Sequence, residues 1–207
     1  MIMITLPLGI YAANCYVLGC PETKKACVID PGGEADKIVD ALKLHDLELE
    51  VIVLTHGHMD HIGGLAELKQ LTGAPIAIHE GDVDMLEDPR INLSNQMGGG
   101  GISLTADRIL KHDDRVKFGN MRLKVIHTPG HTQGSICLKI NEHLFTGDTL
   151  FLRSVGRTDL AGGDQNALVQ SIKKRLYKLP EDTKVYPGHG QDSTIAYEKK
   201  ANMVVRA

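Results

Sequence analysis

Short apolar runs alternate with amphipathic stretches along most of the chain. Runs rich in β-branched residues between turn residues are typical of strands, and apolar positions three and four residues apart predict helices. The predicted strands are Ile2–Leu6, Cys15–Gly19, Ala26–Ile29, Val51–Leu54, Ile76–Ile78, Arg115–Phe118, Met121–Ile126, Ser135–Ile140, His143–Thr146 and Lys184–Tyr186. The predicted helices are Glu34–His45, Ile62–Leu71, Asp82–Leu86, Asn166–Leu179 and Thr194–Asn202. Tight turns such as Gly119-Asn120 indicate antiparallel hairpins in a mixed sheet, with helices over its outer faces.

The segment Asp88–Thr105 is the least regular part of the chain, and residues 98–101 are all glycine. Glycines lose much backbone entropy on folding and add no side chains, so we expect a mobile surface loop. This loop either borders the active site or is a plain connector, and the sequence favours neither reading.

The composition fits one globular domain. The chain has 207 residues, of which 42% are hydrophobic and 24% charged, which is enough apolar content for a sizeable core. We therefore expect residues 1–207 to form a single domain. The formal net charge of -3, without a long run of Lys and Arg, leaves no footprint for nucleic acid and favours a small-molecule substrate.

The N-terminal residues predict neither a signal peptide nor a membrane span. They contain no Lys or Arg up to Cys20 and are interrupted by Pro7, Gly9 and Asn14, so we expect a cytoplasmic protein without membrane attachment. The cysteines lack CxxC spacing, and we expect them to be reduced packing residues. They are Cys15, Cys20, Cys27 and Cys137.

The run from residue 55 to 61 carries three histidines and an aspartate directly after an apolar segment. Imidazole and carboxylate are preferred ligands of zinc, iron and manganese. His56 and His58 point the same way only on an extended backbone, and Asp60 and His61 then lie on the next turn. One loop can thus present two pairs of ligands to two adjacent metals. The alternative, a helix cap with Asp60 as N-cap, gives the histidines no purpose.

Three further donors, His131, Asp148 and His189, each come just beyond the end of a predicted strand, as the His56 loop does. Strand ends at a common sheet edge are where sites assemble in α/β proteins. Asp30 also follows a strand, and its carboxylate suits the outer ring nitrogen of a ligating histidine.

These motifs resemble those of the metallo-β-lactamase superfamily. The matching residues, in the family's order and over nearly the whole chain, are Asp30, His56-x-His58-x-Asp60-His61, His131, Asp148 and His189. The resemblance implies a mixed α+β fold, a four-layer αββα sandwich of two sheets packed face to face with helices outside. It also implies that His56, His58 and His131 hold one metal, that Asp60, His61 and His189 hold a second, and that Asp148 bridges them.

Within the superfamily the chain is similar to the glyoxalase II branch, the hydroxyacylglutathione hydrolases. The segments Thr128–Thr132, Phe145–Phe151 and Gly156–Asp159 fit that branch. Full-length members add a C-terminal helical region that binds glutathione, whereas this chain ends at residue 207, shortly after His189. The short single-domain type, with no separate C-terminal glutathione-binding domain, is the better match. Arg157 is either an anchor for a substrate carboxylate or a solvated surface arginine.

The implied activity is hydrolysis of a thioester such as S-lactoylglutathione. Two divalent metal ions, zinc first with iron or manganese as alternatives, would share a hydroxide and stabilise the oxyanion. Asp60 is a ligand and also a candidate for proton handling. The acyl group, the thiol carrier and the oligomeric state stay open.

Two rival functions also stay open. Persulfide dioxygenases share this fold, the histidine-rich run and a segment like Gly156–Asp159, and hold a single iron through the counterparts of His56, His131 and Asp148. A non-catalytic metal-binding module is the second rival, and it is disfavoured because no ligand is missing. His79, which follows a predicted strand, is a candidate for a supporting contact at the edge of the site.

Overall fold

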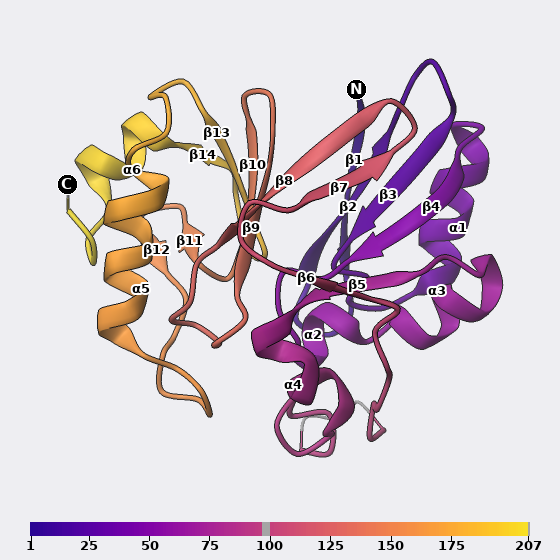
Figure 1. Ribbon diagram of the computed structural model, residues 1–207, viewed down its shortest axis with the longest axis horizontal. Coiled ribbons are helices and arrows are strands. Elements are labelled where there is room, and N and C mark those ends of the chain that lie inside the picture. Colours follow the sequence, from indigo (N-terminus) through magenta and orange to yellow (C-terminus); the bar gives the residue numbers. More distant parts are fainter. Residues whose placement is uncertain (97–99, 207) are drawn as a thin grey trace.

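Two six-stranded sheets pack face to face, and helices cover both outer sides (Figure 1). The computed structural model describes residues 1–96 and 100–206. Gly98 and Gly99, from the glycine run that we expect to be mobile, lie outside the described residues. The four layers confirm the αββα sandwich of the metallo-β-lactamase type.

The first sheet has the strand order β1-β2-β3-β4-β5-β6. β1, β2 and β3 pair antiparallel, whereas β3 to β6 run parallel. Parallel neighbours need long crossover connections, which here contain the helices of the first half of the chain. The strands are β1 Ile2–Leu8, β2 Ala13–Gly19, β3 Lys25–Ile29, β4 Glu48–Val53, β5 Ile76–His79 and β6 Arg108–Leu110.

The second sheet has the order β14-β13-β10-β9-β8-β7. β7 to β10 form an antiparallel meander, which confirms the predicted hairpins, and β13 adds parallel to β10. β14 pairs antiparallel with β13, and β11 pairs with β12 apart from the sheet. The strands are β7 Arg115–Phe118, β8 Met121–His127, β9 Ile136–Ile140, β10 His143–Gly147, β11 Leu150–Phe151, β12 Ser154–Val155, β13 Lys184–Pro187 and β14 Ser193–Thr194.

The helices form two outer layers. α1 and α3 lie on the free face of the first sheet, and α5 and α6 lie on that of the second (Figure 1). Their bounds are α1 Ala35–Leu44, α2 Met59–Ile62, α3 Leu65–Thr72, α4 Val83–Glu87, α5 Gln165–Ser171 and α6 Ile195–Ala201. Within residues 1–96 and 100–206, none of the helices has the length and apolarity needed to cross a bilayer.

Strand β2 shows how the layers are held together. All of its residues are buried. Cys15 and Val17 belong to the apolar cluster beneath α1 and α3, whereas Tyr16 and Leu18 belong to the cluster between the two sheets. Successive strand residues point to opposite faces, so one strand contributes to two cores. A third buried cluster lies between the second sheet and its helices.

The predicted helix Ile62–Leu71 is wrong in its continuity, because Gly63 and Gly64 separate α2 from α3. A Cβ atom on Gly63 would lie 2.4 Å from the backbone oxygen of Gly32, and one on Gly64 would lie 2.6 Å from that of Gly33. The backbone of the segment after β3 is therefore in direct contact with the backbone between α2 and α3. Such a crossing leaves no trace in the hydrophobic periodicity.

The predicted helix Asn166–Leu179 is also wrong in its extent. α5 ends at Ser171, a π-helical turn follows, and that turn ends at Leu176. Four strands, β6, β11, β12 and β14, were not predicted. Each has only two or three residues, too few for a period to be recognised.

All four cysteines are free and buried, as the sequence predicted. Burial raises the pKa of the Cys137 thiol to about 12, so this side chain stays protonated at neutral pH. A protonated, buried thiol is a poor nucleophile and a poor ligand, which agrees with a packing role.

Gly32 offers a test of the close crossing. A Cβ atom there would lie 2.1 Å from the backbone oxygen of Asp60, so Gly32→Ala should destabilise the protein by about 1–3 kcal/mol, measured by urea unfolding. Gly73→Ala is the matched control, because its Cβ meets open space and only its positive φ is strained. If the Gly32 variant is no less stable than the Gly73 variant, the crossing is looser than described.

Candidate metal centre

The predicted metal donors all lie at one edge of the two sheets, where strands end. The first sheet supplies the run after β4, and the second sheet supplies one residue after β8, one after β10 and one after β13. Helix α2 begins within the run and places Asp60 and His61 in its single turn. The structure brings together all seven donors: His56, His58, Asp60, His61, His131, Asp148 and His189.

Three histidines form the first group of donors. Their ligand-capable atoms lie within 4.8 Å of one another. His131 Nε2 lies 2.9 Å from His58 Nδ1 and 3.3 Å from His56 Nε2. Buried ring nitrogens that face one another in this way cannot all be satisfied by hydrogen bonds, because each neutral imidazole has one donor and one acceptor. A divalent cation between them would accept all three lone pairs.

A second group adjoins the first and contains Asp60, His61 and His189. His189 Nε2 lies 3.1 Å from Asp60 Oδ2 and 3.3 Å from His61 Nε2. Two imidazoles and a carboxylate are again a donor set that suits zinc or iron.

Asp148 lies between the two groups. Its Oδ1 is 3.4 Å from His61 Nε2, and its Oδ2 is 3.7 Å from both His131 Nε2 and His189 Nε2. Oδ1 is buried and has no hydrogen-bond partner within the described part of the chain. An unsatisfied buried carboxylate oxygen is costly, and a cation would satisfy it. The donor set therefore fits two divalent metals with Asp148 between them.

Asp30 orients two of the histidines from behind. His61 Nδ1 donates to Asp30 Oδ2 at 3.0 Å, which leaves its Nε2 lone pair free for a metal. The hydroxyl of Thr55 donates to the same oxygen at 2.6 Å, and this hydroxyl lies 3.1 Å from His56 Nδ1. Since the proton of Thr55 is used on Asp30, the hydroxyl can only accept from His56. The buried carboxylate of Asp30 thus fixes the ring orientation of one histidine in each group, His61 directly and His56 through Thr55.

His131 is oriented by the backbone. Its Nδ1 donates to the carbonyl oxygen of Arg157 at 2.7 Å, so its Nε2 also carries the lone pair. Arg157 therefore contributes to the site through its main chain, whatever its side chain does.

Asp82 is a supporting residue that the sequence did not reveal. It is buried and lies at the end of a short 3₁₀ turn, Glu80–Asp82. Its Oδ2 accepts from the backbone amide of Gly57 at 3.2 Å and from the hydroxyl of Thr132 at 2.7 Å, and its Oδ1 accepts from the amide of Gly134 at 2.7 Å. Asp82 therefore joins the loop of His56 and His58 to the loop of His131. Locally it looks like an ordinary helix-capping aspartate.

His79 does not take the supporting place that its sequence position suggested. Its ring stacks on His127 with centroids 4.0 Å apart, and its Nδ1 accepts from the amide of Gly81. These contacts lie outside the two donor groups.

Burial keeps His56 and His58 of the first group neutral. Burial, reinforced by the neighbouring His131, lowers the pKa of His58 to about 3. Burial also holds the pKa of His56 well below its usual range. Burial opposes ionisation of Asp60, yet the hydrogen bond from His189 and the electrostatic effect of His61 hold its pKa below the ordinary value. Burial opposes protonation of His61, but Asp148 and Asp30 raise its pKa, so a metal at its Nε2 would displace a proton. Neutral imidazoles and an ionised carboxylate are the forms that bind metals.

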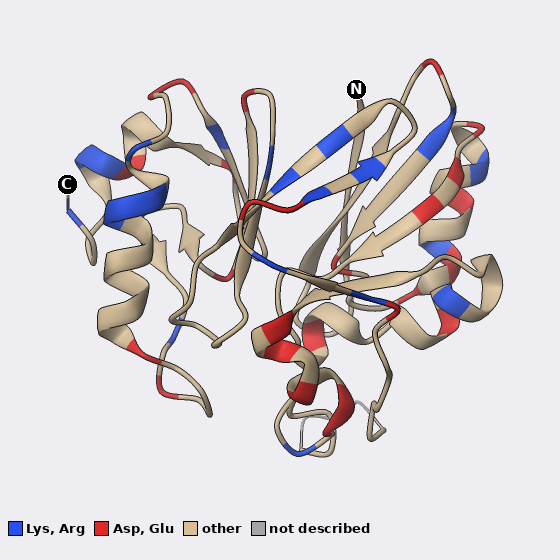
Figure 2. Cartoon of the chain, viewed as in Figure 1, with Lys and Arg blue, Asp and Glu red and all other residues tan. Residues whose placement is uncertain are grey.

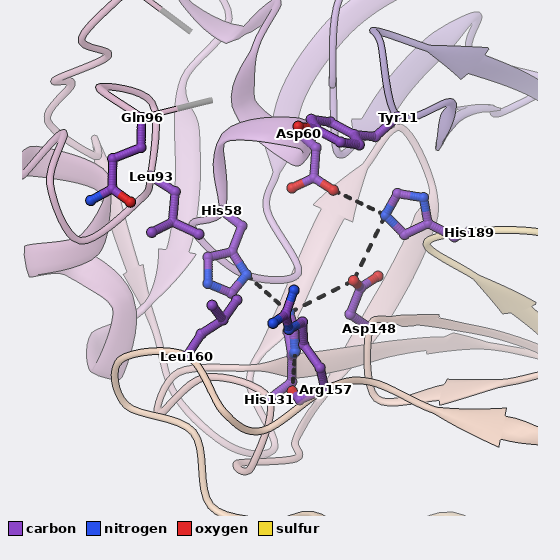
Figure 3. Close-up of a pocket in the computed structure, with 10 residues that line it drawn as sticks. All are labelled: Tyr11, His58, Asp60, Leu93, Gln96, His131, Asp148, Arg157, Leu160 and His189. Atoms are coloured by element: carbon purple, nitrogen blue, oxygen red, sulfur yellow. Dashed lines mark hydrogen bonds and ion pairs between the residues drawn. The ribbon is translucent and has the colours of Figure 1, made fainter. Parts of the chain in front are cut away.

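The donors open into a cavity of about 420 Å³ (Figure 3). Arg157 is the one Lys or Arg among the described lining residues, and its exposed guanidinium pairs with both carboxylate oxygens of Asp159 at 2.7 and 2.8 Å. Leu93 and Gln96 come from the irregular segment before residue 97, so this segment borders the site. The lining residues are Tyr11, His58, Asp60, Leu93, Gln96, His131, Asp148, Arg157, Leu160 and His189.

Residues 8–189 match the model of the metallo-beta-lactamase superfamily. The chain belongs to this superfamily. It is 36% identical to the hydroxyacylglutathione hydrolase GloC of Haemophilus influenzae, over 95% of this chain and 94% of the relative. It is also 36% identical to the probable metallo-hydrolase YqgX of Bacillus subtilis, again over 95% and 94% of the two chains.

Solved structures give the same family. The B3 metallo-beta-lactamase BLEG-1 superposes with a TM-score of 0.93 at 37% identity, over 100% of both chains. ETHE1 from Myxococcus xanthus superposes at 0.84 with 30% identity, over 98% of this chain and 84% of that one. TTHA1623 in a di-iron-bound form superposes at 0.82 with 33% identity, over 98% and 99%. The protein is thus of the metallo-hydrolase type, with a His/Asp cluster for divalent metals.

The two buried aspartates behind the donors give a prediction about metal affinity. Asp82→Asn should weaken zinc binding about 10–100-fold, because it loosens the two loops of the first group. Asp30→Asn should weaken both groups, since Asp30 orients His61 and, through Thr55, His56. The measurement is zinc titration of the metal-free protein against a competing chelator.

The exposed Asp84→Asn on α4 is the matched control and should bind zinc as the unmodified protein does. The unfolding temperature of each metal-free variant separates a loss of folding from a loss of metal. Full zinc affinity in a folded Asp82→Asn variant would contradict the supporting role.

Proposed function

We propose that the protein is a metal-dependent thioester hydrolase of the glyoxalase II-like kind, which cleaves a glutathione thioester such as S-lactoylglutathione. The observation that carries this proposal is the pair of adjoining donor groups with Asp148 between them, open to a cavity. Similarity to GloC, a hydroxyacylglutathione hydrolase, supports it.

The chain's own residues have separate parts in this reaction. His56, His58 and His131 would hold one metal, Asp60, His61 and His189 would hold the other, and Asp148 would contact both. Two divalent ions, zinc in the first place and iron or manganese as alternatives, supply the Lewis acidity that activates water and stabilises charge on the thioester oxygen. The lowered pKa of Asp60 supports its part as a ligand more than its part in proton handling.

A thioester needs little further help from the protein. The leaving thiol has a pKa of about 8.5, so its thiolate departs without a strong general acid. Arg157 is the candidate anchor for a carboxylate of the thiol carrier, because a guanidinium binds carboxylates through two parallel hydrogen bonds. Its present partner Asp159 occupies the same two donors, so a substrate carboxylate would replace Asp159.

Size and charge agree with a small-molecule substrate. The cavity of about 420 Å³ is in the range of ligand pockets in enzymes. Basic and acidic residues are mixed over α1 and α3, basic ones predominate over α6 and the turn after α5, and acidic ones gather around α4 (Figure 2), with a formal net charge of -3. This distribution favours neither nucleic acid nor an anionic membrane as partner.

A second candidate function is a persulfide dioxygenase with a single iron. It is supported by the similarity to ETHE1, and Asp148 Oδ2, at 3.7 Å from both His131 Nε2 and His189 Nε2, is compatible with one metal as well as with two. A non-catalytic metal-binding module ranks last, because all seven donors converge on an open cavity.

One assay separates these functions. The purified protein is analysed for metals and tested for hydrolysis of S-lactoylglutathione, and we expect nearly two ions per chain together with turnover. His58→Ala should lower kcat/KM by about 100-fold or more, since even partners behind a ligand cost 10–100-fold. His45→Ala, on an exposed helix end, is the control and should retain full turnover. About one iron per chain with oxygen uptake on a persulfide would replace the hydrolase by the dioxygenase.

A further inference from the structure

Leu93 has an unusual backbone conformation for its type. Its φ is +71°, in the left-handed region where a Cβ atom crowds the backbone. The other non-glycine residues with positive φ in the described ranges are polar, charged or alanine, so Leu93 is the one branched apolar side chain among them. Such strain costs free energy and persists only where the surroundings impose it, often at binding sites.

The neighbours of Leu93 impose this conformation. Asn92 and Ser94 on either side are buried. The Asn92 carbonyl accepts from the amide of Met59 at 2.9 Å, between two metal donors of the run, and its side chain donates to Ile102 O at 2.9 Å. Ser94 Oγ accepts from the amide of Ile102 at 2.8 Å. The backbone at Leu93 is therefore tied to the metal loop on one side and to the following chain on the other.

The side chain of Leu93 is not packed in the core. Leu93 belongs to none of the three buried clusters and is only partly covered. It lines the cavity instead, and Figure 3 shows Leu93 and Leu160 on the His58 side, with Tyr11 on the other side beyond Asp60. A strained leucine that faces an open cavity rather than the core leaves its apolar surface available to a ligand.

We propose that Leu93, with Leu160, binds the acyl group of the substrate, and that the preferred substrates are thioesters of apolar acids longer than acetate. This inference rests on the proposed thioester hydrolysis and names its substrate class. The thiol carrier is the polar part of such a substrate, and Arg157 is the lining residue that suits its carboxylate. The apolar side chains of Leu93 and Leu160 then remain for the acyl chain.

The test compares acetyl, butyryl and hexanoyl thioesters of glutathione on the metal-loaded protein. We expect kcat/KM of the unmodified protein to rise about two- to fourfold per added methylene, as burial of apolar surface predicts. Leu93→Gly removes the contact and should abolish this rise, mainly through KM, because the contact is the same in the ground state and the transition state. Leu93→Met keeps an apolar side chain and should retain the rise.

A second variant separates loss of the Leu93 contact with the acyl group from the effect of relieved backbone strain. Glycine at position 93 relieves the positive φ, so Leu93→Gly should unfold at the same temperature as the unmodified protein or higher. Lys24→Gly relieves a similar φ of +59° at an exposed turn far from the cavity, and it should keep the full chain-length preference. An equal rise in Leu93→Gly, or no rise in the unmodified protein, would overturn the proposal.

A binding measurement distinguishes failure of this inference from failure of the proposed function. S-methylglutathione and S-hexylglutathione are titrated calorimetrically into the unmodified protein and Leu93→Gly. Suppose that no thioester is hydrolysed, but that S-hexylglutathione binds more tightly than S-methylglutathione to the unmodified protein and not to Leu93→Gly. The apolar subsite is then supported, and the proposed hydrolase activity is refuted. If both ligands bind alike to the unmodified protein, the subsite is refuted even where hydrolysis occurs.

Discussion

The site depends on holding lone pairs of buried imidazoles against one another. Such an arrangement is unfavourable in a protein interior, because nitrogens that face one another cannot all be paired. Two buried carboxylates make it possible. Asp30 accepts from Thr55 and His61, Asp82 accepts from Gly57 and from the loop of His131, and each fixes backbone as well as side chains. The rings are therefore oriented before any cation arrives, which lowers the entropy that binding must overcome.

The two sheets supply the metal donors in different ways. The first sheet supplies a compact run of donors after β4, and the second supplies single donors from three strand ends. Neither sheet alone provides a complete donor group, since the first group needs His131 and the second needs His189. The same donors could serve a hydrolase or an oxygenase. In our proposal, the cavity wall, with Leu93, Leu160 and Arg157, distinguishes substrates.

Much of the fold and all seven residues of the donor set could be predicted from the sequence, whereas part of their support could not. Strands such as Arg115–Phe118 were predicted to the residue, because turn residues bound them on both sides. Asp30 was predicted because it follows a strand, and its contacts agree with that expectation. Asp82 was not, because its partners lie 25 to 52 positions away and nothing nearby indicates them. The left-handed Leu93 was equally hidden, since its conformation is imposed by tertiary hydrogen bonds.

The division of donors between the sheets has a consequence for folding. His56 and His131 are 75 positions apart, and His61 and His189 are 128 positions apart. A cation shared by such a pair closes a long loop of the chain, as a disulfide does, and most restricts the unfolded state when the loop is long. Unlike a disulfide, this link is reversible and depends on supply. Resistance to unfolding should therefore follow the free metal concentration around the protein, so that its folding reports on the metal status of its surroundings.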